Sequence, residues 1–158
     1  MPEPDRERID ERMMGLALEH AERAAGHDDV PIGAVVARGG EILGAAGNER
    51  ELRKDPTAHA EVLALREAAE RLGGWRLPET TIYVTLEPCA MCAGAISLAR
   101  VPRLVYGATD PKGGATGGVI DLYEAPASAA LNHTPQVESG LLSGESKTLL
   151  EGFFADKR

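Results

Sequence analysis

Two short motifs contain the residues whose types and spacing could do chemistry. An HAE motif at residues 59–61 supplies an imidazole and a carboxylate, and a PCAMC motif at residues 88–92 supplies two thiols. Three ligands of the His/Cys type with an open fourth position are typical of catalytic zinc rather than structural zinc. The carboxylate of Glu61 is then not needed as a ligand and can move the protons of a metal-bound water. The motifs therefore predict a hydrolytic enzyme in which His59, Cys89 and Cys92 bind the metal.

The spacing of these residues also predicts where they must lie. Cys89 and Cys92 are at positions i and i+3, so both sulfurs can face one ion from a single helical turn, and a helix start favours thiolates. His59 and Glu61 would point apart on a continuous helix. We therefore expect them in the first turn of a helix capped by Thr57, so that two helix N-termini converge on one metal ion.

Other interpretations of the two cysteines are weaker. A redox pair is possible for a CxxC motif, but the aromatic and Gly-Pro context of thioredoxin-type motifs is missing. A structural zinc site would need a fourth ligand. His20 and His27 are expected to be solvated, and His133 is expected to pack or to cap a loop. A non-enzymatic zinc scaffold would have no use for Glu61.

Periodicity predicts the elements that must position these residues. Four helices are expected: at 8–25, from Asp55–Thr57 to about Leu72, from Pro88 as the first helical residue to about Ala99, and at 144–155. Strands are expected at 30–36, 42–46, 81–86, 104–107 and 136–138. The order predicts one layered α/β domain over residues 1–158, with a sheet between helices. A short helical piece is expected at 119–123. Residues 111–118 lack the Gly-Lys-Ser/Thr of a phosphate loop and are expected to form a mobile loop near the substrate.

Composition limits the classes of protein. The 158 residues are 43% hydrophobic, and no apolar run approaches the roughly 20 residues of a membrane span. The charged N-terminus lacks a signal-peptide pattern, so a cytoplasmic protein is expected. The net charge of −8 argues against broad non-specific nucleic-acid binding, although a local basic patch remains compatible with it.

The motifs resemble those of a known family. An H-x-E followed by P-C-x-x-C is similar to the signature of zinc nucleobase deaminases. More of the chain, from about residue 8 to 155, resembles the tRNA-specific adenosine deaminases. The segments that carry this resemblance are 30–34, Asn48, 55–61, 83–95, 107–115, Asn132-His133 and Phe153-Phe154.

The resemblance implies a fold, a reaction and site residues. It implies a three-layer α/β/α cytidine deaminase-like fold with a five-stranded mixed sheet, a homodimer, and one zinc ion per subunit. The reaction would convert the wobble adenosine of a tRNA anticodon, with an arginine tRNA as the expected substrate, to inosine with release of ammonia. The residues implied are His59, Cys89 and Cys92 for zinc, Glu61 for proton transfer, and Asn48, the Ala60 backbone, Leu86, Asp110 and Lys112 for the flipped nucleotide.

Three alternatives stay open within this resemblance. Asn48 could cap a turn, and Leu86 could belong to the core. The zinc motif would also suit a deaminase of a free base or nucleoside such as guanine or cytosine, which needs no RNA-contacting patch. The net charge is −8, and only a short basic segment stands at the C-terminus, so tRNA binding would depend on few cations. We therefore expect the affinity for tRNA to depend only weakly on salt concentration. The candidate cations are Arg50, Arg53, Lys54, Lys112, Lys157 and Arg158.

Overall fold

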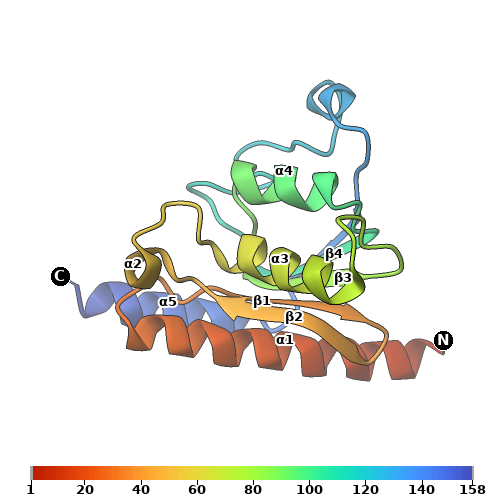
Figure 1. Ribbon diagram of the computed structural model, residues 1–158. Coiled ribbons are helices and arrows are strands. Elements are labelled where there is room, and N and C mark those ends of the chain that lie inside the picture. Colours follow the sequence, from red (N-terminus) through yellow and green to blue (C-terminus); the bar gives the residue numbers. More distant parts are fainter. Residues whose placement is uncertain (1, 158) are drawn as a thin grey trace.

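A five-stranded sheet in the order β2-β1-β3-β4-β5 forms the middle layer of the computed structural model, which describes residues 2–157 (Figure 1). The strands are β1 (Gly33–Arg38), β2 (Glu41–Gly47), β3 (Thr81–Leu86), β4 (Arg103–Ala108) and β5 (Gln136–Ser139). β1 pairs antiparallel with β2 and β3, whereas β3–β4 and β4–β5 are parallel. The mixed sheet of the expected α/β fold is therefore confirmed.

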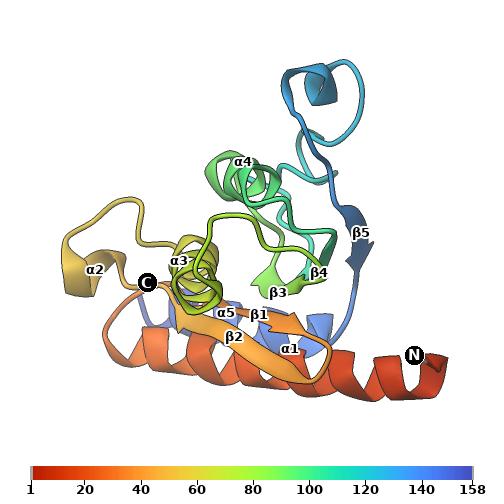
Figure 2. The ribbon, with the colours of Figure 1, turned by 45° about the vertical axis from the view of Figure 1, so that its right-hand side comes forward.

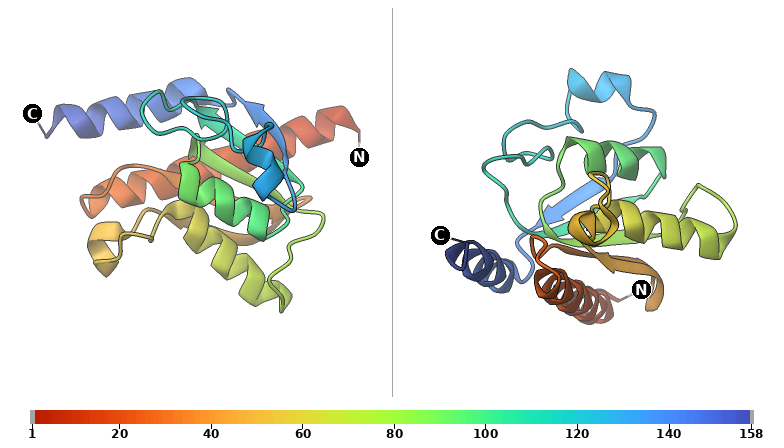
Figure 3. Two further views of the ribbon diagram at one scale, coloured as in Figure 1. Left: turned by 90° about the horizontal axis from the view of Figure 1, so that it is seen from above. Right: turned by 60° about the vertical axis from the view of Figure 1, so that its left-hand side comes forward.

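Helices cover both faces of the sheet. α1 (Glu3–Gly26) and α5 (Ser143–Ala155) lie side by side on one face, and α3 (Ala60–Leu72) and α4 (Ala90–Leu98) cover the other (Figures 1 and 3). α2 (Arg50–Arg53) and the short 3-10 helix η1 (Ala127–Ala130) lie in connections. The segment that carries η1 projects beyond α4 before the chain returns to β5 (Figure 2). No helix of residues 2–157 is long and apolar enough to cross a membrane.

The central strands are buried on both faces because each layer of helices covers one of them. Ile82 and Val84 of β3 face α3 and α4, whereas Tyr83 between them faces α1. Successive side chains of a strand point to opposite faces, so a strand between two helix layers has apolar residues at nearly every position. This pattern explains the continuous β-prone segment over β3.

Two glycines fix how closely the helices approach the sheet. A Cβ at Gly44 of β2 would lie 2.3 Å from the Ala64 carbonyl oxygen of α3, and a Cβ at Gly33 would lie 1.8 Å from the Ala17 carbonyl oxygen of α1. Only a residue without a side chain allows this approach. α3, which begins beside the HAE motif, is thereby held directly against β2.

An ion-pair cluster joins the N-terminal helix to the far side of the sheet. Arg103 of β4 donates hydrogen bonds of 2.9 and 2.6 Å to Asp10 of α1 and also pairs with Glu138 of β5. Tyr83 donates a third hydrogen bond of 2.6 Å to Asp10. Burial acts to raise the pKa of Asp10, but the hydrogen bonds from Arg103 and Tyr83 outweigh it, so the pKa lies below its ordinary value.

The structure differs from the sequence predictions at several element ends. α1 begins at Glu3 rather than near residue 8, because Pro2 precedes it and Glu3 and Asp5 are acidic residues in its first turn. The short helix predicted at 119–123 is wrong: Val119 and Ile120 donate their N–H groups back to the Gly114 carbonyl in a series of turns. The first strand runs over Gly33–Arg38 rather than 30–36.

Candidate active site

The ends of two helices place the three predicted metal ligands. His59 immediately precedes α3 and Cys89 immediately precedes α4; both have an extended backbone, and neither side chain caps its own helix. Cys92 follows in the first turn of α4. The predicted cap at Thr57 is wrong because Thr57 instead closes a separate turn with Asp55, through hydrogen bonds of 2.8 and 2.7 Å to its carboxylate. The predicted helix start at Pro88 is also wrong, since α4 begins at Ala90.

The three ligand atoms converge as the spacing predicted. His59 Nδ1 lies 3.7 Å from Cys89 Sγ and 3.6 Å from Cys92 Sγ, and all three atoms lie within 4.8 Å of one another. Among residues 2–157 this is the cluster of His, Cys and carboxylate side chains that could hold a metal ion. Glu61 is not part of this cluster, and its role in proton transfer stays a prediction.

The electrostatics of the cluster favour a thiolate at Cys89, whereas the hydrogen bond to Cys89 raises the pKa of Cys92. A hydrogen bond from the Cys92 thiol, together with one from His59, lowers the pKa of Cys89 to about 3. The hydrogen bond to Cys89 in turn raises the pKa of His59. A deprotonated sulfur at a helix N-terminus is the form of cysteine that binds metals.

Glu61 lies where its carboxyl group can exchange protons at neutral pH. It is 4% exposed and stands in the first turn of α3, two positions after His59. Burial, with a smaller contribution from the charge of Cys89, raises the pKa of Glu61 to about 7. A carboxyl group with a pKa near the working pH can both accept and return a proton, as general acid–base catalysis requires.

A cavity of about 380 Å³ opens beside His59 and collects most of the predicted substrate residues. Asn48, Leu86, Asp110 and Lys112 all line it. Ala60 does not: it is fully buried. The cavity wall also includes Lys147, Leu150 and Phe154 of α5, which the sequence did not indicate. Phe154 is 46% exposed, which separates it from the core residues.

Asn48 connects the cavity to the start of α3. Its Oδ1 accepts a hydrogen bond of 2.9 Å from the Ala60 N–H, and its Nδ2 donates one of 3.2 Å to the Val30 carbonyl. Asn48 therefore supplies the cap of α3 that neither His59 nor Thr57 provides, whereas its alternative interpretation was the cap of a turn. Since it also lines the cavity, its contact with a base stays a prediction, as does that of the Ala60 backbone.

Comparison with known proteins identifies the group to which this arrangement belongs. Residues 9–158 match the MafB19-like deaminase family. The tRNA-specific adenosine deaminase of Agrobacterium fabrum is 48% identical over 145 residues, which cover 92% of this chain and 93% of that protein. The corresponding protein of Bacillus subtilis is 46% identical over 149 residues, covering 94% and 91%. This chain belongs to the tRNA-specific adenosine deaminases.

Solved structures support membership of the deaminase family and show its breadth. A structure from studies of A-to-I editing by tRNA:A34 deaminases at the wobble position is 47% identical, with a TM-score of 0.84, and covers 88% of this chain and 99% of that one. The guanine deaminase of Nitrosomonas europaea shares the fold with a TM-score of 0.79 at 27% identity, covering 92% and 84%. The fold alone is therefore compatible with more than one base.

The cavity beside His59 also contains an arginine that is held in place by an ion pair, a feature that the motifs did not indicate. Arg50 lines the cavity and donates hydrogen bonds of 3.0 and 2.9 Å to one carboxylate oxygen of Asp29. The other oxygen of Asp29 accepts the Glu51 N–H at 3.0 Å. Burial acts to raise the pKa of Asp29, but these hydrogen bonds lower it overall, so Asp29 stays ionised and holds Arg50 at the cavity.

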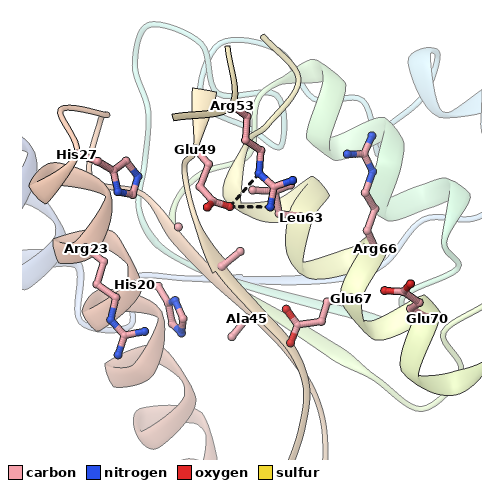
Figure 4. A pocket seen from close by; sticks show the side chains of 12 residues that line it. His20, Arg23, His27, Ala45, Glu49, Arg53, Leu63, Arg66, Glu67 and Glu70 are labelled. Atoms are coloured by element: carbon pink, nitrogen blue, oxygen red, sulfur yellow. Dashed lines mark hydrogen bonds and ion pairs between the residues drawn. The ribbon is translucent and has the colours of Figure 1, made fainter. Parts of the chain in front are cut away.

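The remaining histidines of this deaminase do not join the metal cluster. His27 and His133 each pair with a backbone carbonyl, those of Asn48 at 2.8 Å and Val101 at 2.7 Å. His133 therefore packs as expected, while His27 is less solvated than expected. His20 and His27 line a separate cavity of about 540 Å³, whose lining also includes three arginines and three glutamates, with Arg53 paired to Glu49 (Figure 4). That cavity has no cysteine in its lining.

Proposed function

We propose that this protein is a zinc-dependent hydrolase that converts the wobble adenosine of a tRNA anticodon to inosine and releases ammonia. The observation that carries the proposal is the His59, Cys89 and Cys92 cluster with buried Glu61, in a chain 48% identical to a tRNA-specific adenosine deaminase. An arginine tRNA is the substrate that the resemblance to the family implies.

Zinc fits the donor set. A tetrahedral ion with usual Zn–N and Zn–S bond lengths requires nitrogen-to-sulfur separations of about 3.6 Å. The separations from His59 Nδ1 to the two sulfurs are 3.7 and 3.6 Å. Three protein ligands leave one position for water, and zinc bound here would supply a Lewis acid that ionises water near neutral pH.

The protein's own groups then move the protons. The carboxylate of Glu61 takes a proton from the attacking water and delivers it to the ring nitrogen beside the attacked carbon. It next assists transfer of a proton to the amino group, which leaves as ammonia while the carbon keeps the water oxygen. The raised pKa of Glu61, about 7, suits both directions of transfer.

The cavity residues would hold the nucleotide. Asn48 offers its amide to the edge of the base, and Leu86 offers an apolar wall beside His59. The backbone of Ala60 lies outside the cavity lining, and its N–H holds the side chain of Asn48 in place. Asp110 and Lys112 lie on the loop that follows β4, where they can contact the sugar and phosphate. Enzymes that act on a base usually extrude it into such a pocket.

The test compares an RNA with free bases. An anticodon stem-loop carrying a wobble adenosine, a matched stem-loop with a wobble guanosine, and free guanine, cytosine and adenine are incubated with zinc-loaded protein. We expect inosine in the first RNA and no change elsewhere. Deamination of a free base with an unchanged stem-loop would contradict the proposal.

A free-base deaminase is the second candidate. The observation that favours it is the guanine deaminase of Nitrosomonas europaea, which has the same fold at 27% identity. The cavity wall argues for the RNA substrate instead, because its lining contains three cations, Arg50, Lys112 and Lys147, against two carboxylates, Asp110 and Glu151. A neutral base has no phosphate for them to bind.

We also propose that the protein is a homodimer and acts in the cytoplasm, where its tRNA substrate is found. An apolar hollow between α3 and α4 supports the dimer: Leu65, Ala95 and Leu98 line it together with Trp75. Leu98 is 69% exposed and Trp75 is 57% exposed. Sedimentation at micromolar concentration should give a dimer for the native chain and a monomer for Leu98→Glu.

A further inference from the structure

Glu87 is a buried carboxylate that the chemistry of the metal site does not use. It is 3% exposed and stands between the end of β3 and the PCAMC motif. Its own N–H donates a hydrogen bond of 2.8 Å to the Ala108 carbonyl at the end of β4. Among residues 2–157, no lysine or arginine forms an ion pair with Glu87. A buried charge without a counterion needs hydrogen bonds to both of its oxygens.

The loop after β4 supplies those hydrogen bonds. Oε1 of Glu87 accepts the Asp110 N–H at 3.0 Å. Oε2 accepts the Thr116 N–H at 3.0 Å, the Thr116 hydroxyl at 3.3 Å and the Gly118 N–H at 2.8 Å. The glycine-rich segment therefore surrounds an anion, but the anion is the protein's own side chain. Such a set of converging backbone N–H groups commonly binds an external anion.

The glycines of this loop are explained by the same carboxylate. A Cβ at Gly114 would lie 2.3 Å from Cδ of Glu87, and a Cβ at Gly118 would lie 2.4 Å from Oε1 and 2.6 Å from the Asp110 carbonyl oxygen. A side chain at either position would push the loop away from Glu87. The loop is thus anchored at several backbone groups, in contrast to the mobile loop expected from its glycine content.

The anchored loop connects the metal motif with the substrate cavity. Ala115 donates a hydrogen bond of 2.9 Å to the carbonyl of Pro88, directly before Cys89. At the other end of the loop, the carboxylate of Asp110 accepts the Lys112 N–H at 2.9 Å, and both residues line the cavity. Glu87 holds one end of this loop and the start of the metal motif in a fixed relation.

We propose that Glu87 is a positioning residue for substrate: it fixes the Asp110–Gly118 loop beside the metal motif so that the cavity is preformed for the nucleotide. Glu87 touches neither substrate nor metal, and acts through Asp110 and Lys112. This inference rests on the proposed RNA substrate. Loss of the anchor should therefore affect KM more than kcat. A loop that the substrate must first order weakens substrate binding, whereas proton transfer by Glu61 is largely unaffected.

The test uses variants that disturb the anchor from its two sides. Glu87→Gln keeps the shape but turns one acceptor into a donor facing N–H groups, and Gly118→Ala places a methyl group against the carboxylate. Each should raise KM for the stem-loop RNA at least tenfold, leave kcat within threefold, and leave the metal content unchanged. The KM of the double variant should be no higher than that of the more impaired single variant, since the two substitutions remove the same anchor.

Gly74→Ala is the control, because Gly74 lies in the turn between α3 and β3 and a Cβ there meets nothing within 4 Å. Its KM should equal that of the native protein. If Glu87→Gln does not fold, the KM of Gly118→Ala alone tests the proposal. An unchanged KM in the folded variant, or a fall in kcat with loss of metal at constant KM, would overturn the positioning role.

Amide hydrogen exchange separates this proposal from the proposed function. Exchange at Asp110, Thr116 and Gly118 should become faster in both variants and stay unchanged in Gly74→Ala. If the native protein forms no inosine but these amides exchange faster, the proposed substrate fails while the anchoring by Glu87 stands. If the amides exchange at the native rate, the anchoring itself is wrong.

Discussion

At the residue scale, Glu61 is distinguished from the other acidic residues by its burial beside the metal ligands. Glu61→Gln keeps the size of the side chain but removes the group that accepts and returns protons. We expect kcat for inosine formation to fall at least about 100-fold, the usual contribution of general acid–base catalysis. Zinc content, measured by atomic absorption, should stay at one ion per chain.

Glu67→Gln is the matched control, because Glu67 lies on the same helix but is exposed. It should leave kcat unchanged. Full activity of Glu61→Gln would show that another group moves the protons.

The metal ligands give a second residue-scale prediction. Cys92→Ala leaves two of the three donor atoms, so zinc binding should fall well below one ion per chain. A chelator should lower the Tm of the native protein, because a ligand that binds only the folded state stabilises it. The same chelator should leave the Tm of Cys92→Ala unchanged. An equal shift in both proteins would argue against Cys92 as a ligand.

The sequence predicted the residues with unusual chemistry better than the residues that support them. His59, Cys89, Cys92 and Glu61 were recognised because a rare combination of side chains recurs at short spacing. Asp29 and Glu87 were not, since a single acidic residue looks alike in sequence whether it is solvated or buried. Their partners lie 21 and more positions away along the chain, so only the fold brings them together.

At the element scale, the contact of α3 with β2 depends on Gly44. A methyl group there would meet the Ala64 carbonyl at 2.3 Å, and backbone atoms cannot move aside as a flexible side chain can. We expect Gly44→Ala to lower the free energy of unfolding by about 3 kcal/mol, at the upper end of overpacking effects. Because α3 begins beside His59, zinc affinity should fall too.

Gly15→Ala in α1 is a matched control, since a Cβ there meets nothing within 4 Å. Alanine is the better helix former, so this variant should gain about 0.5–1 kcal/mol. Urea unfolding of both variants measures the difference. Equal stabilities would contradict the close packing of α3 on β2.

The elements themselves were predicted in type and order, while several boundaries were not. Strands with apolar residues at successive positions are recognisable from local composition alone. Helix starts depend on which group satisfies the first N–H donors, and for α3 that group is Asn48 from a different part of the chain. The segment at 119–123 was predicted to be helical, but the N–H groups of Val119 and Ile120 are bound by the Gly114 carbonyl of the loop that Glu87 organises.

At the scale of the whole molecule, the Asp10–Arg103–Glu138 cluster joins α1 to the sheet and makes stability depend on pH. The pKa of Asp10 is lower in the folded chain than in the unfolded one, so its contribution is full at neutral pH. It is lost as the pH falls from about 5 through the folded pKa. Asp10→Asn should cost about 2 kcal/mol at pH 7, and its stability should fall less steeply toward acid pH.

Asp5→Asn is the control on the same helix, because the Asp5 side chain is 49% exposed. It should change stability by less than about 0.5 kcal/mol. Asp29 also has a lowered pKa, so some dependence on pH should remain in Asp10→Asn. Parallel pH curves for Asp10→Asn and the native protein would contradict this role.

The charge distribution of the whole molecule predicts how it binds RNA. The net charge is −8, and the cations at the cavity are Arg50, which pairs with Asp29, together with Lys112 and Lys147. Arg53 and Lys157 lie outside the cavity and pair with Glu49 and Asp28. About three phosphate contacts correspond to a log–log salt slope of about −2 to −3. Fluorescence anisotropy with a labelled stem-loop measures this slope. A slope near −8 would contradict the small number of contacts.

Of the three metal ligands only His59 lines the cavity, and more than half of the lining comes from the segment at the end of β4 and after it and from α5. This separation has a consequence for evolution and for engineering. Substitutions in these walls could change the substrate preference without altering Cys89 and Cys92, which lie outside the lining. A replacement for the loop after β4 would take the same position only if it still places backbone N–H groups and glycines against the carboxylate of Glu87.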